Sequence, residues 1–140
     1  MPRAHEFSIR VRYSESDQMG VVHHANYLIY MEEGRTALMR EFGFPYEDVE
    51  RRGFGMAVRK VDVRYRAAAR YGDMLLVRTW VEGFRGASIT YSYEMLKEPE
   101  RAVVATGSAE VACIGLRDGF RPVPIPADIE RALERALAQD

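Results

Sequence analysis

Acidic and imidazole side chains crowd one short segment of the chain, residues 13–27, around Gly20. Asp17 lies before this glycine, and His23 and His24 follow it. A carboxylate in such a loop can attack a carbonyl carbon or take a proton from water. A helix that begins near His24 leaves unpaired backbone N–H groups in its first turn, and these donors suit the negative charge that develops on a substrate oxygen. The segment therefore offers an attacking base and an oxyanion donor close together in sequence.

The same residues also have simpler interpretations. An aspartate in a polar, glycine-containing turn commonly binds a nearby backbone N–H group with its carboxylate, and Asp17 fits this pattern. A metal site needs more ligands at compatible positions, whereas His23 and His24 are adjacent and the remaining histidine, His5, is remote in sequence. The sequence therefore predicts no metal site, and an imidazole could instead orient Asp17 or shape a pocket.

The pattern Y-x-E-x-D-x-x-G-V-V-H-H-x-N-Y over residues 13–27, followed by Glu-Glu-Gly-Arg over residues 32–35, resembles the hotdog-fold acyl-CoA thioesterases. The group that it resembles most is the 4-hydroxybenzoyl-CoA thioesterase and YbgC-like branch, to which residues 121–126 and the order of elements are also similar. This resemblance implies hydrolysis of short or medium acyl-CoA or aroyl-CoA thioesters to free acid and CoA. It also implies a homodimer or homotetramer with the site at the subunit interface, and no cofactor beyond the CoA of the substrate.

Roles for individual residues follow from the resemblance. It implies that Asp17 acts on the thioester carbonyl, either as a nucleophile or as a general base for water, and the sequence leaves both routes open. It implies that the backbone N–H of His24 is the oxyanion donor, which is typically worth about 3 to 4 kcal/mol of barrier. His23, Asn26 and Tyr27 are expected to bind substrate around this pair, although an N-cap role would explain Asn26 equally well.

Basic residues are expected near the mouth of such a site, because CoA carries phosphates. Arg59, Lys60 and Arg85 are the candidates, within a local cluster that also holds Arg64 and Arg66. Solvated strand faces would explain all of them equally well.

Hydrophobic spacing predicts one long helix over residues 26–42. Its apolar stripe comprises Tyr27, Tyr30, Met31, Gly34, Leu38 and Phe42. Gly34 costs about 1 kcal/mol of helix propensity relative to alanine, so a close approach to a sheet or a ligand should compensate. Glu32, Glu33 and Arg35 are expected on a solvated face with an ion pair.

Alternation with a period of two predicts five strands, at residues 7–13, 60–66, 74–82, 88–95 and 102–116. The second of these should be able to lie at a sheet edge. Spaced apolar residues at 129–137 predict a short C-terminal helix. The sequence therefore predicts an α+β hotdog fold, an antiparallel five-stranded sheet wrapped around one long helix.

Bulk composition sets the remaining limits. A chain of 140 residues with 47% hydrophobic content predicts one domain over residues 1–140. A net charge of −1 gives no general attraction to nucleic acid, and without an apolar N-terminal segment we expect a cytoplasmic protein that does not insert into membranes. Two other functions remain open, a hotdog hydratase or dehydratase of acyl thioesters and a non-catalytic acyl-CoA-binding module.

Overall fold

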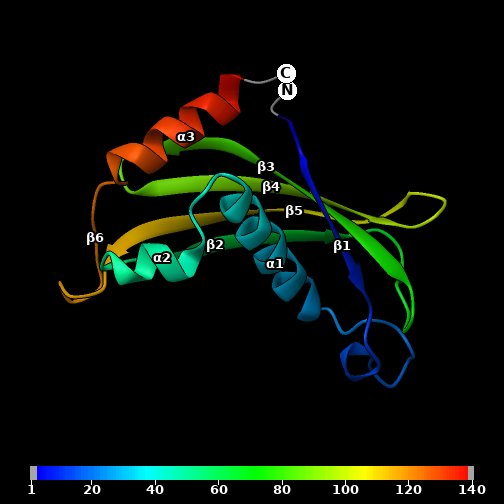
Figure 1. The fold of residues 1–140 in the computed structure, drawn as a ribbon. Helices are drawn as coiled ribbons and strands as arrows, with labels where there is room; N and C mark the ends of the chain where they lie inside the picture. Colours follow the sequence, from blue (N-terminus) through cyan, green and yellow to red (C-terminus); the bar gives the residue numbers. More distant parts are fainter. Residues whose placement is uncertain (1–2, 139–140) are drawn as a thin grey trace.

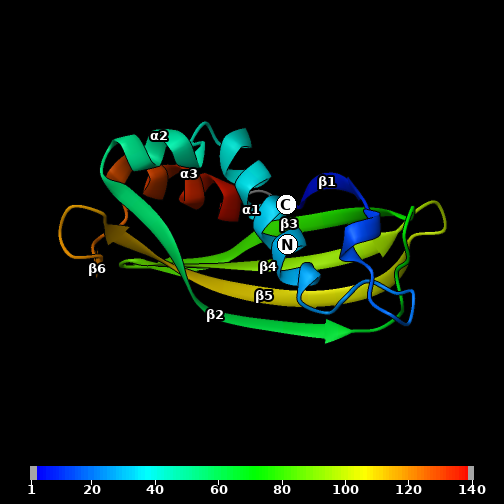
Figure 2. The ribbon, with the colours of Figure 1, turned by 90° about the horizontal axis from the view of Figure 1, so that it is seen from below.

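The computed structural model describes residues 3–138, which form a curved antiparallel sheet with helices on one face (Figures 1 and 2). The strands are β1 (His5–Arg10), β2 (Phe54–Tyr65), β3 (Met74–Arg85), β4 (Ser88–Lys97), β5 (Ala102–Gly115) and β6 (Arg121–Pro122). The helices are the 3-10 helix η1 (Tyr13–Glu15), α1 (Asn26–Glu41), α2 (Tyr46–Arg51) and α3 (Ala127–Ala138). The sheet order is β1-β3-β4-β5-β2, with β6 paired to β5.

This order confirms the predicted plan of one strand, one long helix and four further strands. The sheet curls around α1 as the hotdog fold requires, while α2 and the two-residue β6 are small additions to it. In the described part of the chain, no helix is long and apolar enough to cross a membrane.

The core lies between the sheet and α1, and β4 shows how the sequence produces it. Ile89, Tyr91, Tyr93 and Met95 alternate along this strand and are all buried. The intervening residues Ser88, Thr90, Ser92 and Glu94 are only partly buried, as expected for an antiparallel sheet with one packed face. The predicted stripe of α1 packs against the buried face, with Tyr30 and Met31 almost completely enclosed.

Gly34 marks the point where α1 comes nearest to the sheet. A Cβ atom built on this residue would lie 2.5 Å from Thr79 Oγ1 and 2.9 Å from Val77 Cγ1. Both distances are shorter than real packing allows, so any side chain here would push the helix away from β3. The expected compensation for a glycine within the helix is therefore close packing against the sheet.

The first strand ends earlier than predicted. β1 stops at Arg10, and Tyr13 belongs to η1, where its side chain is 78% exposed instead of facing the core. The reason is local, because the Glu15 carboxylate accepts a hydrogen bond from the Arg12 backbone N–H at 2.8 Å and turns the chain away from the strand direction. The alternation of apolar and polar residues in the sequence continues to residue 13, three residues beyond the end of the strand.

Strand β2 lies at the open edge of the sheet, as predicted, because β5 is its only partner among the described strands (Figure 2). All but one of residues 58–65 are exposed, including Val58, Val61 and Tyr65. Each edge strand presents unpaired N–H and C=O groups that can pair with another strand.

Candidate active site

The loop that carries Asp17 is a tight turn closed by backbone hydrogen bonds. Ser16 and Val22 form an isolated antiparallel bridge, and the Asp17 N–H donates to the carbonyl of Val21 at 2.8 Å. Gly20 adopts a φ of +79°, the left-handed region in which glycine is preferred. The polar, glycine-containing sequence therefore folds locally into the turn that its composition predicts.

One oxygen of the Asp17 carboxylate fixes this turn. Asp17 Oδ1 accepts hydrogen bonds from the N–H groups of Met19 at 2.8 Å and Val21 at 3.4 Å. The simpler interpretation of Asp17, as a turn residue, is thus confirmed. Within residues 3–138 the other oxygen, Oδ2, accepts no hydrogen bond from protein, so one half of the carboxylate holds the loop and the other half remains available for chemistry.

The start of α1 differs from the sequence-based expectation in the part that Asn26 plays. The helix begins at Asn26 with Ala25 as its N-cap, so the alternative interpretation of Asn26 as an N-cap is wrong. The Asn26 side chain instead donates to the Glu15 carbonyl at 2.9 Å. This hydrogen bond ties the helix start to the other side of the loop.

His23 and His24 are both exposed, and their rings stack on each other with centroids 4.4 Å apart. His23 Nδ1 accepts from the Ala25 N–H at 3.3 Å. In the described part of the chain the His24 N–H has no hydrogen-bond acceptor, while its neighbours His23 and Asn26 both use theirs. An N–H without an acceptor, on an exposed residue just before a helix, is the kind of donor that binds an oxyanion.

Tyr27 is buried rather than facing the loop. Its ring packs edge-on against Tyr30 and Tyr65, with centroids 5.7 Å and 5.2 Å away, and burial raises the pKa of Tyr27. The structure therefore places this predicted substrate-binding residue beneath the helix start, where it supports the residues above it.

Glu15 is the residue of this region whose role the sequence analysis did not foresee. It is a buried carboxylate, 5% exposed, that contacts both Arg12 and Tyr30. Its spacing from Arg12 is that of a capping box, in which an acid three residues after the N-cap accepts the N-cap N–H. The spacing of three residues between Arg12 and Glu15 was the sequence signal that could have indicated this role.

The basic candidates lie apart from the loop within one chain. Arg59 Nη1 donates to Ser88 Oγ at 3.0 Å, and Ser88 is the cross-strand partner of Arg85, so Arg59 and Arg85 converge at this hairpin. Lys60 is their exposed neighbour on β2. Tyr65 lies six positions after Arg59 along β2, which is about 20 Å of extended strand. The structure thus groups the basic residues but separates them from Asp17.

The expectation that Arg35 lies on a solvated face is wrong. Arg35 forms the predicted ion pair with Glu32, at 3.7 Å, but it is only 5% exposed. Burial opposes its charge, yet Tyr93, Tyr46 and Glu32 together outweigh this effect and the pKa of Arg35 is raised. Burial in turn raises the pKa of Tyr93 to about 12. Arg35 therefore belongs to a polar cluster beneath α1.

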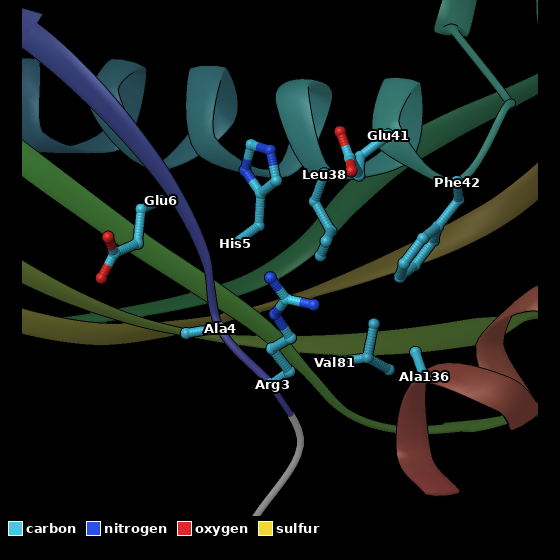
Figure 3. Close-up of a pocket in the computed structure, with 9 residues that line it drawn as sticks. All are labelled: Arg3, Ala4, His5, Glu6, Leu38, Glu41, Phe42, Val81 and Ala136. Carbon is cyan, nitrogen blue, oxygen red and sulfur yellow. The ribbon is translucent and has the colours of Figure 1, made fainter. Parts of the chain in front are cut away.

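A cavity of about 540 Å³ does not contain the predicted site residues (Figure 3). It lies at the other end of α1, with Leu38 and Phe42 on one side and Val81 and Ala136 on another, and Arg3, Ala4, His5, Glu6 and Glu41 complete its lining. The 16 residues of α1 span about 24 Å. In the single chain, the Asp17 loop therefore faces open solvent rather than this cavity. Among residues 3–138 no group of His, Cys, Asp and Glu is arranged to hold a metal ion.

A sheet curls around one long helix, with an acidic loop against the start of that helix, and this is the fold of the hotdog thioesterases. The model of the thioesterase-like superfamily matches residues 11–133, and the chain belongs to this family.

Individual relatives cover almost the whole chain. The putative acyl-CoA thioesterase YneP of Bacillus subtilis is 37% identical over 115 residues, which are 82% of this chain and 82% of YneP. The acyl-CoA thioesterase YbgC of Haemophilus influenzae is 30% identical over 127 residues, covering 90% of this chain and 91% of YbgC. The crystal structure of DHNA-CoA thioesterase from Staphylococcus aureus superposes with a TM-score of 0.91 at 32% identity, covering 96% of this chain and 91% of that one.

Proposed function

We propose that the protein hydrolyses short or medium acyl-CoA or aroyl-CoA thioesters to the free acid and CoA. One observation carries the proposal. In a member of the thioesterase-like superfamily, Asp17 holds its loop with one carboxylate oxygen and keeps the other free, beside a helix start with an unused N–H group. The names of YneP, YbgC and the Staphylococcus aureus enzyme all specify CoA thioesters.

In the proposed mechanism Asp17 supplies the attack. Either its free oxygen adds to the thioester carbonyl, so that departure of the thiolate leaves an anhydride that water then hydrolyses, or it takes a proton from a water molecule that adds to the same carbon. The His24 N–H stabilises the negative oxygen formed in either addition. The carbon–sulfur bond then breaks, and because a thiol has a pKa of about 8.5 the thiolate leaves without a dedicated acid.

A second copy of the chain completes the proposed site. The exposed half of β2, residues 58–65, has unpaired backbone groups and exposed apolar side chains. This segment can pair antiparallel with the same segment of a second subunit, about a two-fold axis through its middle. The start of the segment in one subunit then lies opposite the end of the segment in the other. Arg59 and Lys60 of the partner subunit would then lie near Tyr65, on the side of the Asp17 loop. The pairing therefore removes the separation of about 20 Å found within one chain.

Release of free thiol from a panel of acyl-CoAs tests this function. The panel covers short, medium, long and aromatic acyl groups, with each acyl group also presented on pantetheine, which lacks the nucleotide phosphates. We expect turnover of CoA thioesters and a higher KM for the pantetheine thioesters. Binding of every acyl-CoA without thiol release would instead support a binding module, and addition of water to an enoyl-CoA without thiol release would support a hydratase.

A further inference from the structure

The Glu15 side chain collects more hydrogen bonds than any other side chain of the candidate site. Its Oε1 accepts from the Arg12 N–H at 2.8 Å and from the Tyr30 hydroxyl at 2.9 Å. Its Oε2 accepts from Arg12 Nε at 3.1 Å and Arg12 Nη2 at 2.8 Å. This one buried carboxylate therefore joins the exit of β1 to the second turn of α1.

The backbone of the same residue holds the other side of the loop. The Glu15 carbonyl accepts from the His23 N–H at 2.8 Å and from the Asn26 side chain at 2.9 Å. His23 directly precedes the proposed oxyanion donor, and Asp17 follows Glu15 by two residues. Both halves of the proposed site are therefore attached to residue 15.

We infer that Glu15 is the positioning residue of this site, holding the Asp17 carboxylate and the His24 N–H at the separation that the reaction requires. The inference rests on the proposed function, because it assigns Glu15 no contact with substrate. Glu15 acts only through the positions of the Asp17 carboxylate and the His24 N–H.

A charged acceptor is required at this position. Four donors converge on the carboxylate, and two of them belong to the Arg12 guanidinium. A neutral amide has one acceptor oxygen in place of two, so the N–H donors that face its NH₂ group, either those of the Arg12 guanidinium or the Arg12 backbone N–H, lose their acceptor. The exposed Arg12 guanidinium then turns to water, and the loop loses the ion pair that ties it to the end of β1.

The decisive experiment compares kcat and KM of the wild-type protein with those of Glu15→Gln, Glu15→Asp, Asp17→Asn and the double variant Glu15→Gln/Asp17→Asn, on the acyl-CoA that the wild type hydrolyses fastest. For Glu15→Gln we expect kcat to fall roughly 10- to 100-fold, the effect of a displacement of about 1 Å between reacting groups, with KM changed less than about threefold. Glu15→Asp keeps the charge and should retain an intermediate kcat. In the Asp17→Asn background, Glu15→Gln should cost little more, since residues that act as a unit are not additive.

The matched control is Glu94→Gln on the outer face of the sheet. It removes a carboxylate with an equally short hydrogen bond, 2.8 Å to Arg78, and should leave kcat unchanged. Rates are measured well below the melting temperature of every variant, so that loss of folded protein does not enter. A Glu15→Gln kcat within twofold of wild type would overturn the inference, and so would an equal loss in both backgrounds if Asp17→Asn alone lowers turnover.

The proposed function itself fails if the wild-type protein releases no thiol from any acyl-CoA. The proposed role of Asp17 fails separately, if Asp17→Asn retains full turnover. In that case a reduced kcat in Glu15→Gln would still support positioning through the His24 side of the loop, and an unchanged kcat would overturn it.

Discussion

Tyr65, the last residue of the edge strand β2, donates a hydrogen bond of 3.1 Å to the carbonyl oxygen of His24. Its ring also packs edge-on against Tyr27 at the start of α1. Half of the Tyr65 side chain is nevertheless exposed, at the edge proposed to meet a second subunit. The peptide next to the proposed oxyanion donor is therefore held by the strand that forms the open edge of the sheet.

Replacing Tyr65 with phenylalanine tests whether this contact serves the reaction. The variant keeps the ring and loses only the hydroxyl, so the free energy of unfolding should fall by about 0.5 to 1.5 kcal/mol, the net value of one hydrogen bond. We expect kcat to fall roughly 3- to 10-fold as the His24 peptide gains freedom. Tyr71→Phe is the matched control, since that exposed hydroxyl makes no hydrogen bond within the described residues. Equal rates for the two variants would show that the Tyr65 hydroxyl plays no part.

The open edge can be tested through the oligomeric state. Val61 is 37% exposed in the middle of the free half of β2, and lysine at an edge strand opposes pairing with another strand. We expect Val61→Lys to shift the protein toward a monomer in light scattering and to lower its thioesterase rate at the same time. Val103→Lys on β5 changes an equally exposed valine and should do neither. A Val61→Lys protein that stays dimeric with full activity would contradict the proposed pairing.

The period-two and helical patterns predicted the scaffold because they report burial directly. Ile89, Tyr91 and Tyr93 alternate in the sequence for the same reason that they face α1 in the structure. Gly34 could also be predicted as a contact point, since a glycine within a buried helical stripe needs a packing reason. Both predictions depend only on the spacing of residues within one strand or one helix.

The site was predictable only in part, because its contacts join residues from different elements. The motif marked Asp17 and His24, but no periodicity showed that Glu15 would meet both Arg12 and Tyr30. Arg35 was expected in solvent because charged residues are mostly exposed, and its burial depends on tyrosines from other elements. The distance between Arg59 and the loop likewise follows from the length of β2, which a list of basic residues does not reveal.

The close contact of α1 with β3 predicts an unusual response at Gly34. Alanine favours a helix by about 1 kcal/mol over glycine, but here its Cβ would lie 2.5 Å from Thr79 Oγ1. Overpacking typically costs 1 to 3 kcal/mol, and a contact of 2.5 Å puts this site in the upper part of that range. After the helix gain is subtracted, urea unfolding should show Gly34→Ala to be less stable than wild type by about 1 to 2 kcal/mol. The double variant Gly34→Ala/Thr79→Ala should recover part of this loss. An equally stable or more stable Gly34→Ala would mean that the helix is less tightly packed than the structure indicates.

Acid should weaken the fold through Glu15. Burial alone would raise the pKa of Glu15, but hydrogen bonds from Arg12 and Tyr30 outweigh it and hold the pKa below its ordinary value. A carboxylate with a lowered pKa in the folded state stabilises the fold above its unfolded pKa of about 4.3, and this contribution is lost as the pH falls through the folded pKa. Urea unfolding between pH 6 and pH 3 should therefore show a steeper loss of unfolding free energy for wild type than for Glu15→Gln. Parallel curves would show that Glu15 does not titrate with the fold.

The central claim is that Asp17 carries out the attack, and the Asp17→Asn variant tests it most directly. Asparagine retains an oxygen that can accept from the Met19 and Val21 N–H groups, so the loop and the melting temperature should be preserved while the base or nucleophile is lost. The measurement is the steady-state rate of thiol release from the preferred acyl-CoA, with Asp48→Asn on α2 as a control of the same chemical change at an exposed position. We predict that Asp17→Asn lowers kcat by about 10²- to 10⁴-fold and that Asp48→Asn leaves it unchanged. A folded Asp17→Asn protein with near-normal turnover would contradict the account.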